Sequence, residues 1–408
     1  MGTPKISLSA ATALALLAGA LLGGEPASSS APASAPGTIL YAGTATAVAD
    51  SYLVVFPGNT TAEETTRRTG ELNAKYGGSV RFTYTAALKG FAVQATAAQA
   101  ASMAGDPLVS YVAQDQTVGL QDVQVQTGPP SWGIDRIDQR SLPLDNKYFY
   151  PNTAGNVRAF VIDTGLLLTH KEFGGRAFCG FDPWGEGCAP CNQGHATHVA
   201  GTLGGSTVGV AKGVRIVSVR VFQCTSSTTF AIVIAGIDYV TFAQQTTPSA
   251  RSVANLSLGG GPFQPLDDAV TASIDANVHY SIAAGGSGTS ACNFSPARVP
   301  RATTVAATDI NDNRALFTNI GSCVDVFAPG TNIYSAWYTA DNAYATLSGT
   351  SMSAPHAAGT AALWRQRFPA DNADAVHDAL NANATPGVVV NPGLGSPNKL
   401  LYMGMIPA

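Results

Sequence analysis

The sequence predicts an α/β protein with a mostly parallel sheet covered by helices on both faces, preceded by a small α+β unit. From Val157 onward, short and almost continuous apolar segments alternate with helical ones, a pattern typical of strands buried on both faces. The chain has 408 residues, 45% of them hydrophobic, which exceeds one typical domain and suffices for a large core. The expected strands are 157–162, 215–222, 253–258, 280–284 and 304–307, and helices are expected to begin near Gly194, Thr228, Pro265 and Thr350 and over 373–381.

The small unit is expected over residues 50–119. Its apolar and helical segments follow the order β-α-β-β-α-β of a ferredoxin-like fold. The strands are expected at 52–56, 80–84, 90–95 and 108–113, and the helices at 61–76 and 97–104. Residues 120–130 are polar, lack a clear period and end in Gly128-Pro129-Pro130, which predicts a linker. The larger unit would then span 131–408.

The amino-terminal segment, residues 1–35, has the composition of a secretory signal peptide. Lys5 precedes an apolar run over 6–22, and a Ser/Ala/Pro tract follows. The alternative, a membrane anchor, is weaker because the run is short for a span and includes Ser7, Ser9 and Thr12. No later stretch of the sequence is long enough for a transmembrane helix. The formal net charge of −4 offers no basic surface for nucleic acid.

Six cysteines agree with export. An even number in an oxidising compartment favours three disulfides, but their pairing stays open at this point. They are Cys179, Cys188, Cys191, Cys224, Cys292 and Cys323. The alternative is a zinc site formed by Cys188, Cys191 and His195, and it lacks a second close pair of ligands.

One stretch of small residues, from Ser348 to His356, holds a candidate nucleophile. Ser351 lies just before an apolar run over 357–364 that predicts a buried helix. The free N–H groups and the positive dipole end at a helix N-terminus favour developing negative charge. Ser351 could therefore act on a substrate that becomes an oxyanion. The plainer alternative is that this serine only caps the helix.

Two further motifs supply an acid and a base. Asp163 ends a short apolar strand and is followed by Thr-Gly, and His195 opens a small-residue helix that also carries His198. Serine needs an adjacent base to become a nucleophile at neutral pH, and histidine titrates near that pH. The chain order Asp…His…Ser differs from the orders of chymotrypsin and of the α/β-hydrolases.

With these three motifs the chain resembles the subtilisin-like serine proteases, in particular the secreted proteinase K and aqualysin group, from about Tyr52 to Leu401. The resemblance implies a three-layer subtilisin-like fold. It also implies that His195 is the base, Asp163 orients it and Ser351 attacks, whereas His198 is structural. Asp182 and Asp309 could replace Asp163, but neither ends an apolar strand followed by Thr-Gly.

The resemblance extends to the region before the linker. Residues 87–92 and 109–115 resemble the propeptide that such proteases carry, which assists folding and inhibits the enzyme until it is removed. The alternative is an independent binding domain, and the position directly before the protease argues against it. Maturation is expected around Val123 to Gln126. The family also implies the disulfides Cys191–Cys224 and Cys292–Cys323, which leaves Cys179–Cys188.

One part of the family's machinery is missing. Gly286 stands where the family normally carries an asparagine whose amide donates to the oxyanion, so only the Ser351 N–H remains of the usual pair. In subtilisin, a relative, loss of this donor costs about 10²–10³ in kcat. The sequence therefore predicts a slowed protease. The alternative is a catalytically impaired homologue that binds peptides. An esterase of the α/β-hydrolase class is excluded by the residue order and by Ser353 at the last glycine of G-x-S-x-G.

Substrate is expected to bind by extended backbone pairing. Two stretches match the family's cleft: Ser257, Leu258, Gly259 and Gly260 form one edge, and Ala283, Ala284 and Gly285 form a pocket wall whose small residues predict a broad, apolar-leaning preference. The opposite edge departs from the family at Ser226 to Thr228, where relatives often have glycines. The alternative for each glycine run is a turn or tight sheet packing.

Calcium is the one expected cofactor, with a structural role, and catalysis needs none. By resemblance, Asp325 with the backbone oxygens of Pro300 and Ala302 forms one site. Asp135, Asp138, Gln139 and Asp145 match a second site incompletely, because Lys147 falls where another oxygen ligand is expected. Carboxylate and carbonyl oxygens suit this ion, and the alternative is solvated surface acids.

Taken together, the sequence predicts a secreted, extracellular serine endopeptidase made as a self-processed zymogen. Its expected partners are peptide or protein substrates and its own propeptide. It is expected to be a monomer, without nucleic acid and without a membrane once the signal is removed.

Overall fold

A computed structural model describes residues 37–120, 124–126 and 131–407 of the chain. The predicted signal peptide and most of the predicted linker lie outside these residues. Among the described residues, no helix is both long and apolar enough to cross a membrane.

A nine-stranded sheet forms the centre of the larger unit, with the strand order β18-β19-β15-β14-β13-β11-β7-β9-β8. Neighbouring strands are parallel except at the β18–β19 edge. Its strands are β7 (Val157–Asp163), β8 (Ala177–Phe181), β9 (Arg215–Arg220), β11 (Arg251–Leu256), β13 (Val278–Ala283), β14 (Thr303–Thr308), β15 (Val326–Pro329), β18 (Thr385–Pro386) and β19 (Lys399–Leu400). The predicted parallel sheet is confirmed.

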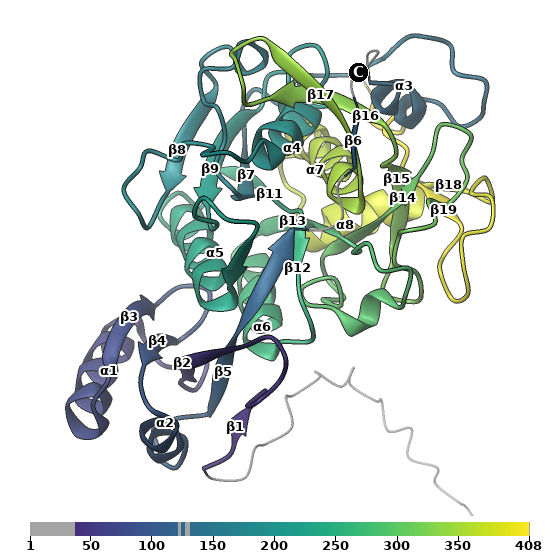
Figure 1. Ribbon diagram of the computed structural model, residues 1–408. Coiled ribbons are helices and arrows are strands. Elements are labelled where there is room, and N and C mark those ends of the chain that lie inside the picture. Colours follow the sequence, from purple (N-terminus) through teal and green to yellow (C-terminus); the bar gives the residue numbers. More distant parts are fainter. Residues whose placement is uncertain (1–36, 121–123, 127–130, 408) are drawn as a thin grey trace, which may run out of the picture. The chain divides into compact units, whose positions relative to one another are not determined.

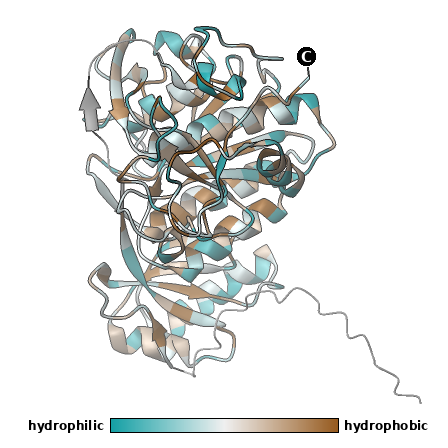
Figure 2. Cartoon of the chain, turned by 90° about the vertical axis from the view of Figure 1, so that its right-hand side faces the viewer, coloured by the Kyte–Doolittle hydropathy of each residue, from teal (hydrophilic) through white to brown (hydrophobic). Residues whose placement is uncertain are grey.

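Helices cover both faces of this sheet, as the apolar character of its strands requires. One buried cluster joins the sheet to α4 (His195–Gly204), α7 (Thr350–Arg367) and α8 (Ala373–Asn383). A second joins its other face to α5 (Phe230–Gln245) and α6 (Gln264–Asp275). Figure 1 shows these three layers, and Figure 2 shows hydrophobic residues along the strands and covering helices. The short elements are α3 (Gly133–Asp138), η1 (Lys171–Phe173), η2 (Ala291–Asn293) and the antiparallel pair β16 (Ile333–Trp337) and β17 (Ala343–Ser348).

The small amino-terminal unit has the predicted ferredoxin-like order. It consists of β2 (Ala47–Val55), α1 (Ala62–Tyr76), β3 (Ser79–Tyr84), β4 (Gly90–Gln94), α2 (Ala97–Ala104) and β5 (Tyr111–Leu120). Both helices begin with capping boxes, at Thr61 with Glu64 and at Thr96 with Gln99, which satisfy free N–H groups of the first turn. A strand that was not predicted, β1 (Ile39–Leu40), pairs in parallel with β5.

Strand β5 is longer than predicted and leaves the small unit. Its carboxyl-terminal part pairs antiparallel with β10 (Ser227–Thr229) and with β12 (Leu258–Gly259) of the larger unit. A short strand on the far side of residues 121–123, β6 (Gln124–Gln126), pairs antiparallel with β17. The polar sequence here predicted a linker. The pairing of β5 and β6 could not be seen in the sequence, because their partner strands lie far away in the chain.

All six cysteines form disulfides. The pairs are Cys179–Cys188, Cys191–Cys224 and Cys292–Cys323, which are the pairs that the family resemblance implies. The first bond ties β8 to the loop that follows it.

Candidate active site

The acid and the base meet at the carboxyl edge of the sheet. Asp163 is the last residue of β7, and His195 is the first residue of α4. Nδ1 of His195 lies 2.8 Å and 2.9 Å from the two carboxylate oxygens of Asp163. Both residues are buried, so the carboxylate fixes the ring orientation and can stabilise an imidazolium.

Ser351 lies in the first turn of α7, as its sequence context predicts. Its hydroxyl donates to the carbonyl oxygen of Ser257 at 3.2 Å, and the Ser257 hydroxyl donates back to the Ser351 carbonyl at 2.9 Å. Within the part of the chain that the structure describes, Nε2 of His195 has no hydrogen-bond partner. The acid–base pair is thus assembled, whereas the hydroxyl of Ser351 is hydrogen-bonded to the backbone and not to His195.

The other histidines nearby are held neutral. His198 contacts the carbonyl oxygen of Ile333 through Nε2 at 2.9 Å, and burial lowers its pKa to about 3. Burial also lowers the pKa of His356 to about 4. Because a general base must titrate near the working pH, these two residues suit a structural role.

The loop that carries Gly286 is fastened on both sides. The backbone N–H of Gly285 donates to the Thr350 hydroxyl at 3.1 Å, which ties this loop to the residue before Ser351. The side chain of Asn319 accepts from Ser287 N at 3.0 Å and donates to Ala284 O at 2.9 Å. Thr350 and Asn319 were not predicted. A hydroxyl residue directly before the candidate nucleophile was the available signal for Thr350, and Asn319 had none.

Extended chain pairs with the predicted cleft edges. Leu258 pairs with Leu120 and Gly259 with Gly119, while Thr228 on the opposite edge pairs with Val118. On the far side, Gln124 pairs with Ser348, three residues before Ser351. The predicted wall residues Ala283, Ala284 and Gly285 are buried. The edges that were predicted to bind substrate therefore pair with an extended segment of the chain itself.

One group of acids that was predicted to bind calcium lies close together. Oδ2 of Asp135 accepts from Asn146 N at 2.9 Å, and Oδ1 of Asp135 is buried without a partner among the described residues. Burial, with the nearby charges of Asp135 and Asp145, raises the pKa of Asp138 to about 6. Gln139 Oε1 accepts from Asp145 N at 3.2 Å, which joins it to the same group.

Asp325, the carboxylate of the other predicted calcium site, has both a backbone donor and a lysine near it. Asp325 accepts from Thr304 N at 2.7 Å. Burial raises the pKa of its carboxyl, while the hydrogen bond from Thr304 N and the neighbouring Lys399 act in the opposite direction. Pro300 is exposed and Ala302 is buried.

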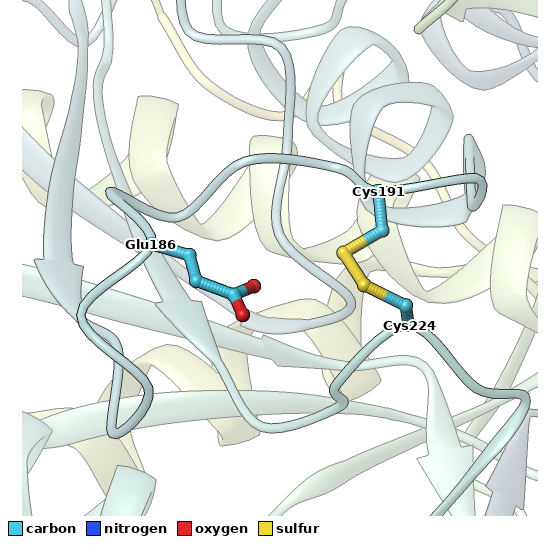
Figure 3. A group of neighbouring side chains, drawn as sticks. All are labelled: Glu186, Cys191 and Cys224. Carbon is cyan, nitrogen blue, oxygen red and sulfur yellow. A yellow bond between two sulfur atoms is a disulfide. The ribbon is translucent and has the colours of Figure 1, made fainter.

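The alternative of a zinc site is wrong. Cys188 and Cys191 are oxidised in two different disulfides, and a cysteine binds zinc only as a thiolate. Figure 3 shows Glu186 beside the Cys191–Cys224 disulfide. Its carboxylate pairs with Arg220 at 2.7 Å, so these three residues have structural partners.

The site contains a paired acid and base, and a serine hydroxyl at a helix N-terminus. Strand edges that pair with extended chain lie in the same structure. These features are typical of the serine proteases. Comparison with known proteins identifies the family. A model described as "Subtilase family" matches residues 160–399, and one described as "Peptidase inhibitor I9" matches residues 51–121. The chain belongs to the subtilase family of serine proteases and carries an I9 propeptide.

Several relatives share most of the chain. The "Extracellular serine proteinase" of Thermus sp. (strain Rt41A) is 49% identical over 328 residues, which are 80% of this chain and 78% of that protein. The "Alkaline serine exoprotease A" of Vibrio alginolyticus is 42% identical over 385 residues, 91% of this chain and 71% of that protein. The crystal structure of a cold adapted subtilisin-like serine proteinase superposes with a TM-score of 0.64 at 48% identity, covering 67% of this chain and 98% of its own.

Proposed function

We propose that the chain is the precursor of a secreted serine endopeptidase that cuts its own propeptide from the peptidase domain. The observation that carries this proposal is the buried Asp163–His195 pair, together with the chain's own strands, which pair with β12 and β17 on the two sides of residues 121–123. The names of the relatives support the extracellular location.

Asp163, His195 and Ser351 divide the reaction between them. The Ser351 hydroxyl turns from the Ser257 carbonyl toward Nε2 of His195, gives up its proton and attacks the scissile carbonyl carbon. His195 then holds the proton as an imidazolium stabilised by Asp163, and passes it to the leaving amine. The backbone N–H of Ser351 donates to the oxyanion. Gly286 supplies no side-chain donor, so we propose that acylation is slow in this enzyme.

The pairing on both sides also narrows the proposed processing position. The sequence placed the cut around Val123 to Gln126. Because β5 pairs with the cleft edge up to Leu120 and β6 pairs with β17 from Gln124, we propose that the cut bond lies between these two residues. Val123 itself lies outside the described residues.

Replacing the nucleophile tests the proposal. Ser351→Ala is expected to leave a precursor that keeps residues 50–119 covalently attached. Ser353→Ala is the matched control, because Ser353 lies on the same turn of α7 and its hydroxyl donates to Ala328 O at 3.1 Å. The control should process normally. A Ser351→Ala protein that still cuts itself in the absence of other proteases would contradict the assignment of the nucleophile.

Gly286 gives a specific reason to keep a second candidate, an impaired subtilase homologue that binds peptides. Labelling with a serine-directed fluorophosphonate separates the two. The proposed enzyme is expected to react at Ser351, and a purely binding homologue would not.

We also propose that calcium stabilises the peptidase domain at the residues around α3. Burial and the charge of Asp145 raise the pKa of both Asp135 and Asp138, and one oxygen of Asp135 is buried without a partner among the described residues, which fits a hard cation with oxygen ligands. Asp135, Asp138, Asp145 and Gln139 would hold it. The structure favours this site over the other proposed one, with Asp325, Pro300 and Ala302. The reason is that Lys399 lines the same cavity as Asp325. The remaining partner proposals are a monomeric enzyme, without nucleic acid and without a membrane after removal of the signal.

A further inference from the structure

A cavity of about 600 Å³ lies at the amino ends of the parallel strands, at the other end of β7 from Asp163. Two arginines line it: Arg158 is the second residue of β7, and Arg215 is the first residue of β9. The aromatic residues Phe178 and Tyr239 line it as well. Nothing in the proteolytic mechanism uses this cavity.

The two arginines stand directly opposite each other. Arg158 and Arg215 are paired across the neighbouring parallel strands β7 and β9, so their side chains leave the sheet on the same face. Like charges in this position destabilise a sheet. Burial, together with the charge of Arg215, lowers the pKa of Arg158. The arrangement therefore carries an electrostatic cost that an anion between the two groups would relieve.

No protein carboxylate offsets that cost. Among residues 37–120, 124–126 and 131–407, neither arginine forms an ion pair. Arg158 instead donates to neutral oxygens: Gln244 Oε1 at 3.2 Å, the Ser252 hydroxyl at 3.2 Å and the Ala243 carbonyl at 3.3 Å. Arg158 is thus held in place by its neighbours while its charge stays uncompensated.

Aromatic rings form the apolar part of the wall. The Arg215 guanidinium lies over the Phe178 ring, 5.4 Å from its centroid, and Phe178 remains 43% exposed. The Tyr239 hydroxyl approaches Gly180, where a β-carbon would come within 2.8 Å of that oxygen. Gly180 thereby leaves room for Tyr239 at the wall, so both aromatic rings offer the cavity an apolar lining against which a flat group can pack.

We propose that this cavity binds a carboxylate attached to a flat apolar group, with the carboxylate between Arg158 and Arg215. Guanidinium groups recognise carboxylates through paired, charge-assisted hydrogen bonds. Such a ligand could be a free aromatic acid or the carboxyl-terminal aromatic residue of a peptide product. Both share the same recognition chemistry.

Thermal unfolding of the full-length Ser351→Ala protein tests the proposal without self-digestion. Benzoate and N-acetylphenylalanine are the two ligand probes, the neutral N-acetylphenylalanine amide controls for the carboxylate, and inorganic phosphate controls for the apolar group. We expect a saturable rise in Tm with at least one carboxylate and none with the amide, because a ligand that binds only the native state stabilises it. A response to benzoate alone would indicate a free aromatic acid as the ligand. A response to N-acetylphenylalanine as well would indicate that the carboxyl-terminal aromatic residue of a peptide also fits. An equal response to phosphate would refute the role of the rings.

Arg215→Gln should abolish the response to the carboxylate. The matched control is Arg367→Gln, since Arg367 also lies over an aromatic ring, 5.3 Å from the Phe368 centroid, but far from this cavity in the sequence. Without ligand and at low salt, Arg215→Gln should raise Tm, and added salt should shrink that gain by screening. A carboxylate response that persists in Arg215→Gln, or no response in the parent protein, would overturn the proposal.

Discussion

Substituting Gly286 by asparagine should restore the donor that this enzyme lacks. Preorganised donors act on the charge that develops in the transition state, so their effect falls on kcat. In subtilisin, a member of the same family, this donor is worth about 10²–10³ in kcat, or roughly 2.7–4 kcal/mol. We expect Gly286→Asn to raise kcat by about one to three orders of magnitude with little change in KM.

The backbone around Gly286 favours this outcome. The positive φ angles of the loop fall on Gly285, at 99°, and on Gly288, at 65°, whereas Gly286 is not among the glycines with positive φ. Asparagine at 286 therefore meets no left-handed penalty. The hydrogen bonds of Asn319 to Ser287 N and Ala284 O hold the loop on both sides, so the new amide would start from a fixed backbone.

Steady-state kinetics on a chromogenic peptide substrate measure the effect, and the rate of precursor processing provides a second readout. Gly286→Asp is the matched control, because aspartate has the same shape but donates no hydrogen bond when ionised. A kcat that is unchanged or lower in a well-folded Gly286→Asn protein would refute the missing-donor explanation. An equal gain with aspartate would show that the amide donor is not the cause.

Further predictions concern stability, maturation and pH. Removing calcium with a chelator should lower Tm by mass action, and Asp135→Asn should abolish that difference. Equal melting curves of the parent protein with and without chelator would refute the calcium proposal. Replacing Cys292 and Cys323 by serine should cost about 3–4 kcal/mol of unfolding free energy, since the bond closes a loop with a sequence separation of 31; denaturant titration measures this, and no loss would contradict it. Mass spectrometry of the mature protein should find its first residue between Gln121 and Gln124; a first residue outside this range would refute the proposed cut. Burial raises the pKa of Asp115 in β5 to about 6, so protonation favours the bound propeptide. This contribution is present at low pH and is lost as pH rises through about 6. Propeptide release should therefore quicken as pH rises from about 4 to about 6, and Asp115→Asn should flatten that dependence; an unchanged pH profile in the variant would refute the role of Asp115.

The parallel sheet and its helices could be predicted because their signals are local. The apolar run before Asp163 and the small-residue segment after Thr350 can each be recognised from their own residues, because the first is almost continuously apolar and the second is followed by a long apolar run. The same holds for α1 and α2, whose capping residues Thr61 and Thr96 stand directly before them. The family motifs then supplied the roles that periodicity alone does not assign.

Features that depend on distant partners could not be predicted in this way. The extension of β5 to Leu120 needs β10 and β12, which are more than one hundred residues away. The hydrogen bond from Gly285 to Thr350 and the brace formed by Asn319 depend on side-chain placement in the folded protein. The arginine pair at Arg158 and Arg215 likewise appears only when β7 and β9 lie side by side.

The position of β5 between β10 and β12 has a consequence for the mature enzyme that we propose. Once β5 departs, these two strands become unpaired edges separated by a slot one strand wide, and their backbone N–H and C=O groups lose their partners. Any extended segment can refill this slot through its main chain, largely regardless of its side chains. Proline is the exception, because it has no N–H to donate. Peptides with proline where Gly119 and Leu120 now pair should therefore be poor substrates, whatever residues surround it.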